Sequence, residues 1–394
     1  MLQLTQPSPS LDLPLSWEAR GLYVHIPFCF HKCHYCDFYS ITRQSPERME
    51  AFVDRVLAEA TLWVTPTIRP SPRTVFFGGG TPSLLPINCM RRLIAGLKNC
   101  FILSGVDEWT VECNPATVSG DYCRMLIDSG VTRLSFGAQS FRPGELKLLE
   151  RDHDPDDVPR SLDFARSAGF TRLNLDLIFA IPGQTLEDWL GNLNCAIELN
   201  VPHLSCYALT YEPNTALTVR KRLGQFASVD EALELQMLRV TRTVLAQHGY
   251  RAYEISNFAR TGEACRHNLQ YWQGENYLGL GPSAASHVDG HRWKNRPHLR
   301  EWETAVDTGD LPVVDYETLS PEHRARELAM LLLRLDAGLN FADFSARTGY
   351  SPHALFNDQI NSLMKLGLIH LDDEHIALTD KGLGVADAVA AEFL

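Results

Sequence analysis

Short apolar segments alternate with helical sequence along the first half of the chain, and this alternation restricts the fold more than any other feature. The segments are LYVHI (22–26), TVFFGG (74–79), WTVEC (109–113), RLSFG (133–137), RLNLDLI (172–178) and HLSCYAL (203–209). Strand, loop and helix in repetition predict parallel βα units. Because no G-x-G-x-x-G opens the first helix, six units favour an α/β fold built as a partial (βα)6 barrel of the TIM type over a doubly wound sheet.

The sequence divides into four parts on these patterns. Residues 1–20 are proline-containing and predict a flexible tail, and residues 21–212 hold the barrel. Residues 213–320 combine a long helix, expected over 229–248, with a Gly- and aromatic-rich stretch. Residues 321–394 read as helices followed by strand, turn and strand, which predicts an α+β, winged-helix-like domain. Acidic side chains outnumber lysines in its last part, so a packing or partner-contact role is favoured over DNA binding.

The formal net charge of −12 argues against nucleic-acid partners, because nonspecific binding depends on neutralising phosphates. The sequence shows neither a signal peptide nor an apolar run long enough to span a bilayer, although peripheral membrane contact stays open. Ten cysteines without an export signal are typical of a reducing compartment. We therefore expect a cytoplasmic protein in which clustered thiols bind metal or react.

Three cysteines lie close together in the pattern C-x3-C-x2-C, directly after the first expected strand. They are Cys29, Cys33 and Cys36. Three thiolates can hold three irons of a [4Fe–4S] cube and leave the fourth iron open to an exogenous ligand. The alternative is a structural zinc, whose fourth ligand would be His25, His31 or His34. The cysteines alone leave both centres open.

Polar residues recur where the expected strands end. Glu112, Gln139 and Asp176 follow or interrupt three successive apolar segments. The carboxyl ends of barrel strands face the active site, and an acidic residue inside an apolar strand is otherwise costly. The sequence GGGTPSLL (78–85) follows the second strand, and its glycines allow backbone N–H groups to approach a carboxylate closely. Together with the cysteines, these residues predict a ligand site at this end of the barrel.

These motifs together resemble the radical S-adenosylmethionine superfamily. The resemblance rests on the cysteine pattern with Tyr35 inside it, on GGGTP, and on the Glu, Gln and Asp positions. YVHIPFC (23–29), ECNP (112–115), RLSFGAQSF (133–141) and NLDLIFAIPGQT (174–185) are similar to the coproporphyrinogen-dehydrogenase-related branch of that superfamily. The resemblance extends from about residue 21 nearly to the C-terminus.

The resemblance implies that the three cysteines hold a [4Fe–4S] cluster and that the methionine end of S-adenosylmethionine chelates the fourth iron. An electron passed to the cluster, from a reductant such as a flavodoxin or a ferredoxin, would cleave the cofactor to methionine and a 5'-deoxyadenosyl radical. The protein orients the cofactor and excludes water. By motif position, the expected cofactor-binding residues are Tyr23, Gly79, Gly80, Thr81, Glu112, Gln139, Arg151 and Asp176.

Two members of this branch differ in function, and the sequence distinguishes them. The oxygen-independent coproporphyrinogen III oxidases carry a further cysteine, in the pattern C-x3-C-x2-C-x-C. Here Phe38 takes that position, and the chain starts close to the first strand. Both features count against decarboxylation of propionate side chains, which stays open as the alternative activity.

HNLQYW (267–272) instead resembles the haem-binding signature of the HemW family of haem chaperones. The expected haem contacts are His267 as axial ligand, Cys265 as an alternative thiolate, and the rings of Tyr271 and Trp272. The second candidates are His287, His291 and His298. The resemblance implies that haem is cargo for an acceptor protein, and it leaves a homodimer and radical turnover open. A zinc-structured interaction module is the remaining alternative.

Overall fold

The computed structural model describes residues 18–65 and 69–394 of the 394-residue chain. Residues 1–17 of the expected flexible tail lie outside the described residues. Within the described ranges, no helix combines the length and the apolar character needed to cross a lipid bilayer.

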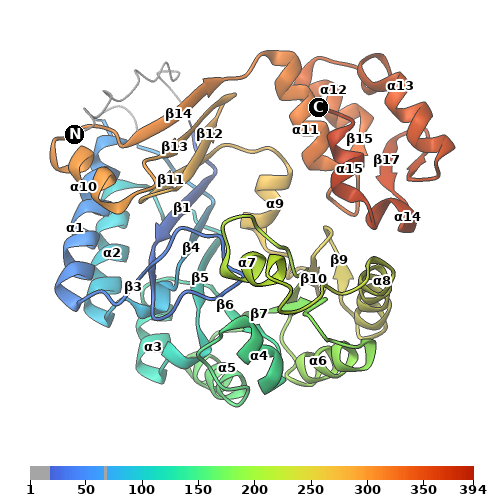
Figure 1. The fold of residues 1–394 in the computed structure, drawn as a ribbon. Coiled ribbons are helices and arrows are strands. Elements are labelled where there is room, and N and C mark those ends of the chain that lie inside the picture. Colours follow the sequence, from blue (N-terminus) through green and yellow to red (C-terminus); the bar gives the residue numbers. More distant parts are fainter. Residues whose placement is uncertain (1–17, 66–68) are drawn as a thin grey trace.

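Six parallel strands form the centre of the molecule, in the order β1-β4-β5-β6-β7-β8 (Figure 1). They are β1 (Gly21–Ile26), β4 (Thr74–Gly79), β5 (Glu108–Cys113), β6 (Arg133–Gln139), β7 (Arg172–Phe179) and β8 (His203–Ala208). Helix-containing crossovers join them, so successive strands are neighbours in the sheet. The expected six βα units of an α/β barrel are confirmed.

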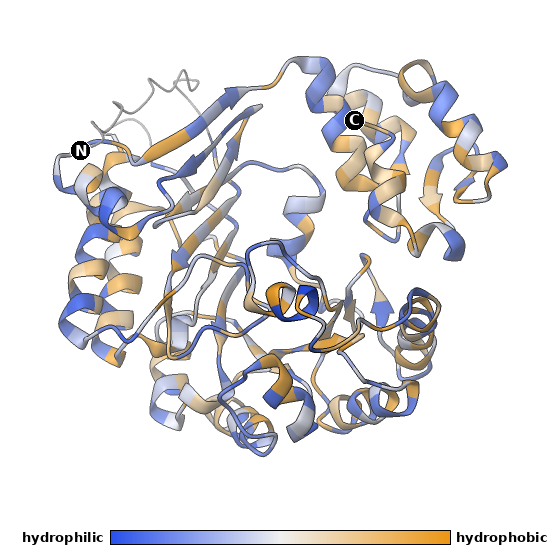
Figure 2. Ribbon diagram, viewed as in Figure 1, coloured by the Kyte–Doolittle hydropathy of each residue, from blue (hydrophilic) through white to orange (hydrophobic). Residues whose placement is uncertain are grey.

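Helices cover the outer face of this sheet. They are α1 (Pro46–Leu62), α2 (Ile87–Cys100), α3 (Gly120–Asp128), α4 (Pro143–Leu149), α5 (Asp157–Ala168), α6 (Leu186–Glu198) and α8 (Glu231–Gln247). Local sequence fixes their starts: Ser45 caps α1, and Thr185 with Asp188 forms a capping box on α6. Helix α1 buries one face, which includes Phe52 and Val56. Orange and blue alternate along these helices in Figure 2, as expected for amphipathic helices on a core.

The sheet continues beyond the six strands at both edges. On one side β11 (Tyr277–Leu280) pairs in parallel with β1, followed outward by β12 (Ala285–Val288), β13 (His291–Asn295) and β14 (Val313–Thr318). On the other side β10 (Asn257–Ala259) runs antiparallel to β8 and pairs with β9 (Arg251–Ala252). We expected residues 213–320 to be a helix and an irregular stretch, so these six strands were missed. They contain only two to six residues each, which is too short for a clear strand period.

Three shorter helices occupy the ends and one edge of the barrel. They are α7 (Ala216–Arg222), α9 (Arg266–Trp272) and α10 (Leu299–Asp307). Helix α9 lies within the curve of the sheet, and α10 packs against α1 (Figure 1). The long helix expected over 229–248 is α8.

The last part of the chain folds around a core of its own. Its helices are α11 (Pro321–Leu332), α12 (Phe341–Thr348), α13 (Pro352–Lys365), α14 (Asp380–Leu383) and α15 (Ala386–Ala391). Its sheet contains β15 (Leu339–Asn340), β16 (Ile369–Leu371) and β17 (His375–Leu378). Helices followed by strand, turn and strand confirm the expected α+β, winged-helix-like order. Arg334 of this unit lies over the ring of Trp272, 4.8 Å from its centroid, so the unit packs on α9.

Candidate cofactor site at the barrel mouth

The three cysteines lie on one loop at the carboxyl ends of the parallel strands, which we call the mouth of the barrel. The loop leaves β1, and its two ends are held together by β2 (Phe28–Cys29) and β3 (Ile41–Thr42), which pair in parallel. The N–H of Cys36 donates to the carbonyl of Cys33 over 3.2 Å and forms a turn. All three thiols are free and half-buried, so the loop presents them without a disulfide.

Burial favours the protonated form of Cys29 and Cys36, although two of the loop sulfurs accept hydrogen bonds. Sγ of Cys29 accepts a hydrogen bond from the hydroxyl of Thr81 at 3.6 Å, and Sγ of Cys33 accepts one from Nη1 of Arg151 at 3.6 Å. Burial raises the pKa of Cys36 to about 11 and also raises the pKa of Cys29. A metal centre would displace these protons, because only the thiolate is a ligand.

The zinc alternative finds no support in this geometry. Among residues 18–65 and 69–394, no three His, Cys, Asp or Glu side chains converge closely enough to hold a single metal ion. The candidate fourth ligands are engaged elsewhere: His25 bonds a backbone carbonyl, His31 pairs with a glutamate and His34 contacts an arginine. A cube gives each thiolate its own iron, so its three sulfurs need not meet at one point. The donor set therefore fits the cube better than zinc.

Two buried carboxyl groups line a cavity of about 100 Å³ below the mouth. Burial, and then the negative charge of Asp176, raise the pKa of Glu112 to about 8. Asp176 accepts hydrogen bonds from Ser135 at 3.0 Å and Asn174 at 2.8 Å, yet burial still raises its pKa. No cation among the described residues forms an ion pair with either group. The positive charge of Arg151 lowers the pKa of Asp176 but is the smallest of its causes, so the pair still suits a positively charged organic ligand.

Arg151 places a positively charged side chain at the same site. Its Nη2 donates to the carbonyl of Gly137 over 2.7 Å, while its Nε is buried without a partner among the described residues. Gln139 adopts a left-handed φ of 64° at an irregularity in β6, a strained conformation that is typical of functional sites. A Cβ at Gly137 would come within 2.9 Å of the Gln139 amide and 3.1 Å of Arg151, so a larger residue there would displace the ends of both side chains. The free N–H of Arg151 suits an anionic group of a ligand.

The GGGT turn holds the cysteine loop in place. The N–H groups of Gly80 and Thr81 donate to carbonyls of β1 and of the cysteine loop, at 2.9 and 2.7 Å. The N–H of Gly79 donates to Glu112. Our expectation that these N–H groups approach a ligand carboxylate is therefore wrong, because all three already have acceptors. Contact of this turn with a methionine moiety stays a prediction, through close backbone approach at Gly79, where φ is +101°.

Tyr23 connects the barrel interior to the cysteine loop. Its ring stacks on Phe76, with centroids 6.3 Å apart, and Phe76 lines the cavity below the mouth. Its hydroxyl lies 3.2 Å from Nδ1 of His25, and Nε2 of His25 bonds the carbonyl of Tyr39 over 2.8 Å. Since Tyr39 belongs to the cysteine loop, the expected cofactor residue on β1 and the loop form one bonded unit.

The HNLQYW segment forms α9 at the amino ends of the strands, which we call the base of the barrel. His267 is 1% exposed, and both of its ring nitrogens have protein partners. Nδ1 lies 2.8 Å from the hydroxyl of Thr74, the first residue of β4, and Nε2 lies 3.0 Å from the hydroxyl of Tyr271. We expected this imidazole to ligate haem iron. In the observed arrangement neither nitrogen is available, so that role stays a prediction and requires α9 to move.

The other expected haem contacts are also packed at the base. Cys265 donates to Oε1 of Glu108 over 3.3 Å, and burial raises the pKa of its thiol. Tyr271 meets the ring of His267 edge-on, with centroids 4.9 Å apart. Trp272 lies against an arginine of the C-terminal unit. The haem roles of these residues likewise stay predictions, and the mouth and the base are separate sites.

Comparison with known proteins identifies the family of this chain. Residues 23–195 match the family model of the radical SAM superfamily, and residues 319–385 match the HemN C-terminal domain. The heme chaperone HemW of Lactococcus lactis is 33% identical, with 96% of this chain and 98% of the relative covered. This chain belongs to the HemW family. The heme chaperone HemW of Escherichia coli is 39% identical, over 68% of this chain and 70% of the relative.

A solved structure shares the fold of this HemW-family chain. Coproporphyrinogen III oxidase (HemN) from Escherichia coli superposes with a TM-score of 0.83 and 24% identity, covering 95% of this chain and 90% of that one. The match includes the barrel and the C-terminal unit. At this level of identity it establishes the fold alone.

The cysteine loop of this HemW-family member also exposes two aromatic rings. Phe38 is 67% exposed, and Phe30 is 71% exposed. Both rings belong to the loop that carries the three cysteines. The mouth therefore combines three thiols with an apolar rim.

The three second-choice histidines lie along the sheet edge beyond β11. His287 is half-buried beside Tyr277, with ring centroids 6.3 Å apart. Nδ1 of His291 lies 2.8 Å from the hydroxyl of Tyr316. His298 is exposed and precedes α10, and no described residue bonds its ring nitrogens. Of these candidates in the HemW-family chain, His298 has both nitrogens accessible.

Sequence reasoning missed the helix that closes over the cysteine loop. The N–H of Leu217 in α7 donates to the carbonyl of His34 over 2.8 Å, and Nη1 of Arg220 lies 2.9 Å from Nδ1 of the same histidine. Thr215, which caps α7, and the basic run RKR (220–222) were the available signals. It also missed the polar layer that supports Asp176, which alternates with apolar positions along β6, β7 and β8.

Proposed function

We propose that this chain is a haem chaperone, which binds haem and delivers it to an acceptor protein, and that a [4Fe–4S] cluster and S-adenosylmethionine bind at the mouth of its barrel. The observation that carries the proposal is the mouth of a HemW-family chain, where three free thiols lie near two carboxyl groups that form no ion pair among the described residues. The relatives are named heme chaperones, and their name supplies the cargo.

In this proposal the three cysteines of the loop hold the cluster and leave one iron for the cofactor. Glu112 and Asp176 supply negative charge for cationic groups of S-adenosylmethionine, and Arg151 supplies a buried N–H for its carboxylate. When bound, the cluster and cofactor supply one-electron cleavage of the sulfonium. The remaining proposed cofactor contacts are Tyr23, Gly79, Gly80, Thr81 and Gln139.

A small electron carrier, such as a flavodoxin or a ferredoxin, would reduce the cluster. The exposed rings of Phe30 and Phe38 offer it a contact surface on the loop that carries the thiols. We also place the protein in the cytoplasm, since all ten cysteines are unpaired, as expected in a reducing compartment.

Oxygen-independent coproporphyrinogen III oxidase is the competing function, because the fold superposes on HemN with a TM-score of 0.83. Phe38 counts against it, since the further cysteine of those oxidases is replaced. A chaperone transfers haem unchanged whereas the oxidase releases carbon dioxide, so one preparation can be tested for both.

The test is a haem titration of anaerobically reconstituted protein. We expect a saturating, red-shifted Soret band, followed by transfer of that band to apomyoglobin offered as acceptor. An unchanged spectrum of added haem would overturn the haem proposal. Release of carbon dioxide from coproporphyrinogen, in the presence of S-adenosylmethionine and dithionite, would establish the oxidase instead. Protein that takes up zinc but no iron and sulfide would overturn the cluster.

A further inference from the structure

A hollow of about 570 Å³ opens between the cysteine loop and the start of α10. Its volume lies within the roughly 300–1,000 Å³ of pockets that hold small organic ligands. The residues that matter in its lining are Tyr39, Ile41, Arg48, His298, Arg300 and Glu301. Tyr39 and Ile41 belong to the cysteine loop, so the hollow adjoins the mouth of the barrel.

His298 gives this hollow a free metal ligand. Its imidazole is exposed, and none of the described residues bonds its ring nitrogens. Its only ring contact in the described chain is edge-on with Tyr39, with centroids 6.4 Å apart. His267 at the base differs, because Thr74 and Tyr271 take both of its nitrogens. An axial ligand of haem iron needs an accessible lone pair, which His298 has in the observed structure.

The lining also matches the charge of a carboxylated ligand. Arg300 forms no ion pair with any described residue, and Arg48 pairs with Glu303 at 2.6 Å. Glu301 is the one carboxylate among the lining residues. Because Arg48 is already paired, Arg300 is the lining cation that remains without an acidic partner among the described residues. Arginine is the preferred partner of carboxylates because its N–H groups can bind both oxygens.

One wall of the hollow is apolar and fixed in position. The hydroxyl of Tyr39 accepts a hydrogen bond from the N–H of Leu299 over 2.7 Å, which holds the ring between the loop and α10. Ile41 lies in β3, where it pairs with Phe28. A flat aromatic ligand can pack on such a wall while its charged arms remain near the arginines.

We infer that this hollow binds an iron porphyrin, with His298 as axial ligand and with Arg48 and Arg300 facing its carboxylate arms. The inference rests on the proposed haem function and assigns the cargo a site beside the cluster loop, away from the base.

The position of the hollow explains how a cluster would influence haem binding. Ile41 pairs with Phe28, which is next to the first cysteine, and the carbonyl of Tyr39 bonds His25. The cysteine loop is therefore both the ligand loop of the cluster and a wall of the hollow. Loss of the cluster frees this wall, so haem should bind more weakly to a cluster-free variant. A haem ligand at the base would not respond in this way.

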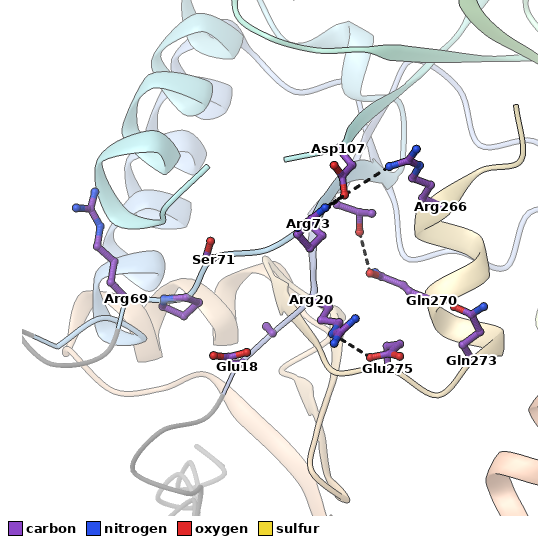
Figure 3. Close-up of a pocket in the computed structure, with 13 residues that line it drawn as sticks. Glu18, Arg20, Arg69, Ser71, Arg73, Asp107, Arg266, Gln270, Gln273 and Glu275 are labelled. Atoms are coloured by element: carbon purple, nitrogen blue, oxygen red, sulfur yellow. Dashed lines mark hydrogen bonds and ion pairs between the residues drawn. The ribbon is translucent and has the colours of Figure 1, made fainter. Parts of the chain in front are cut away.

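A second hollow, of about 750 Å³, lies at the base beside α9 (Figure 3). Two of its arginines already have acidic partners: Arg20 pairs with Glu275 at 3.2 Å and Arg73 with Asp107 at 2.6 Å (Figure 3). None of the described residues that line it carries an imidazole, a thiol or a thioether. It thus offers haem no iron ligand among the described residues.

The experiment compares haem titrations of the cluster-reconstituted wild type and of His298→Ala, followed by the Soret band. We expect His298→Ala to weaken haem binding at least tenfold, and added imidazole to restore the band. His248→Ala removes another exposed histidine, at the end of α8, and should bind as the wild type does. His267→Ala removes the base imidazole and should retain the wild-type band position.

The outcomes separate the two proposals. If the wild type gives no Soret change, the haem function fails and this site fails with it. If the wild type binds haem and His298→Ala binds it equally well, the site is wrong while the haem function stands. The same holds if only His267→Ala loses the band. Arg300→Gln tests the contact with the carboxylate arms. It should weaken the binding of haem but not the binding of haem dimethyl ester. Equal affinity of Arg300→Gln and the wild type for haem would overturn that contact.

Discussion

The mouth and the base of the barrel differ in whether their acidic side chains form ion pairs. At the base, Oε2 of Glu108 pairs with Nε of Arg133 at 3.0 Å, and its other oxygen accepts from Cys265 and the N–H of His267. At the mouth, Glu112 is half-buried by surface exposure and forms no ion pair with any described cation, and its pKa is raised to about 8. A paired buried charge holds elements together, whereas an unpaired one leaves room for a ligand.

A histidine inside a sequence motif is therefore not necessarily free to bind a ligand. HNLQYW carries the residues expected to bind haem, yet the structure uses His267 to join α9 to β4 through Thr74. His298 belongs to no motif and is free. The state of hydrogen bonding separates the two more clearly than the sequence pattern does.

Loss of a single loop cysteine should have the largest effect. Cys29→Ala, Cys33→Ala and Cys36→Ala should each abolish cluster binding, because two thiolates cannot hold the cube securely. Iron and sulfide analysis with the visible spectrum measures this. Cys195→Ala, which removes an exposed cysteine far along the chain, is the matched control and should keep the full cluster. Full iron and sulfide content in any of the three loop variants would show that the loop cysteines at the mouth do not hold the cluster.

Breaking the charge pair of the base should cost about 3–5 kcal/mol of unfolding free energy. Arg133→Gln removes the close partner of the Glu108 carboxylate, which is 0% exposed, and leaves only Arg172 at 3.9 Å. Urea unfolding of the two proteins measures the difference. Arg142→Gln is the control, since its ion pair with Asp188 is at the surface and should contribute less than about 1 kcal/mol. Similar losses for both variants would contradict a structural role for the buried pair.

The parts of this molecule that the sequence predicts are those fixed by local patterns. The six barrel strands are short apolar runs bounded by turns, and the cysteine spacing lies within one loop. The polar residues at the strand ends were correctly placed at the mouth, because parallel strands bring their carboxyl ends together. Glu112 and Asp176 meet in one cavity for this reason.

The parts that could not be predicted depend on contacts distant in sequence. His267 bonds Thr74, 193 positions earlier, and nothing near HNLQYW indicates that partner. The N–H groups of Gly80 and Thr81 are used by β1 and the cysteine loop, which a local glycine pattern does not reveal. The edge strands β9 to β14 form because a neighbouring strand offers hydrogen bonds, and their own sequences are too short to specify them.

Removing the unpaired carboxyl of the mouth should have a smaller, pH-dependent effect. The pKa of Glu112 in the folded chain, about 8, lies above its ordinary value, so the stability it contributes is present at low pH and is lost as pH rises through 8. Thermal unfolding of the cofactor-free chain should therefore show a decline in stability towards pH 8 that is weaker in Glu112→Gln.

The same variant should bind S-adenosylmethionine about tenfold more weakly, or about 1.4 kcal/mol, while the cluster spectrum stays in place. Equilibrium dialysis measures this affinity. Glu145→Gln is the control, because Glu145 is bonded by side chains of α6 outside the cavity. Equal affinity of Glu112→Gln and wild type would show that the unpaired charge at the mouth does not serve the cofactor.

The smallest effect on stability is expected at the apolar rim of the mouth. Phe38→Ser should change the unfolding free energy by no more than about 0.5 kcal/mol, because the ring is 67% exposed and packs little. If the rim serves as a contact surface for an electron carrier, the same change should slow cluster reduction by flavodoxin and leave reduction by dithionite unaffected. Phe38→Tyr keeps the ring and should behave as wild type. A loss of stability in Phe38→Ser comparable to that of Arg133→Gln would mean that the rim, like the base, is part of the packed structure.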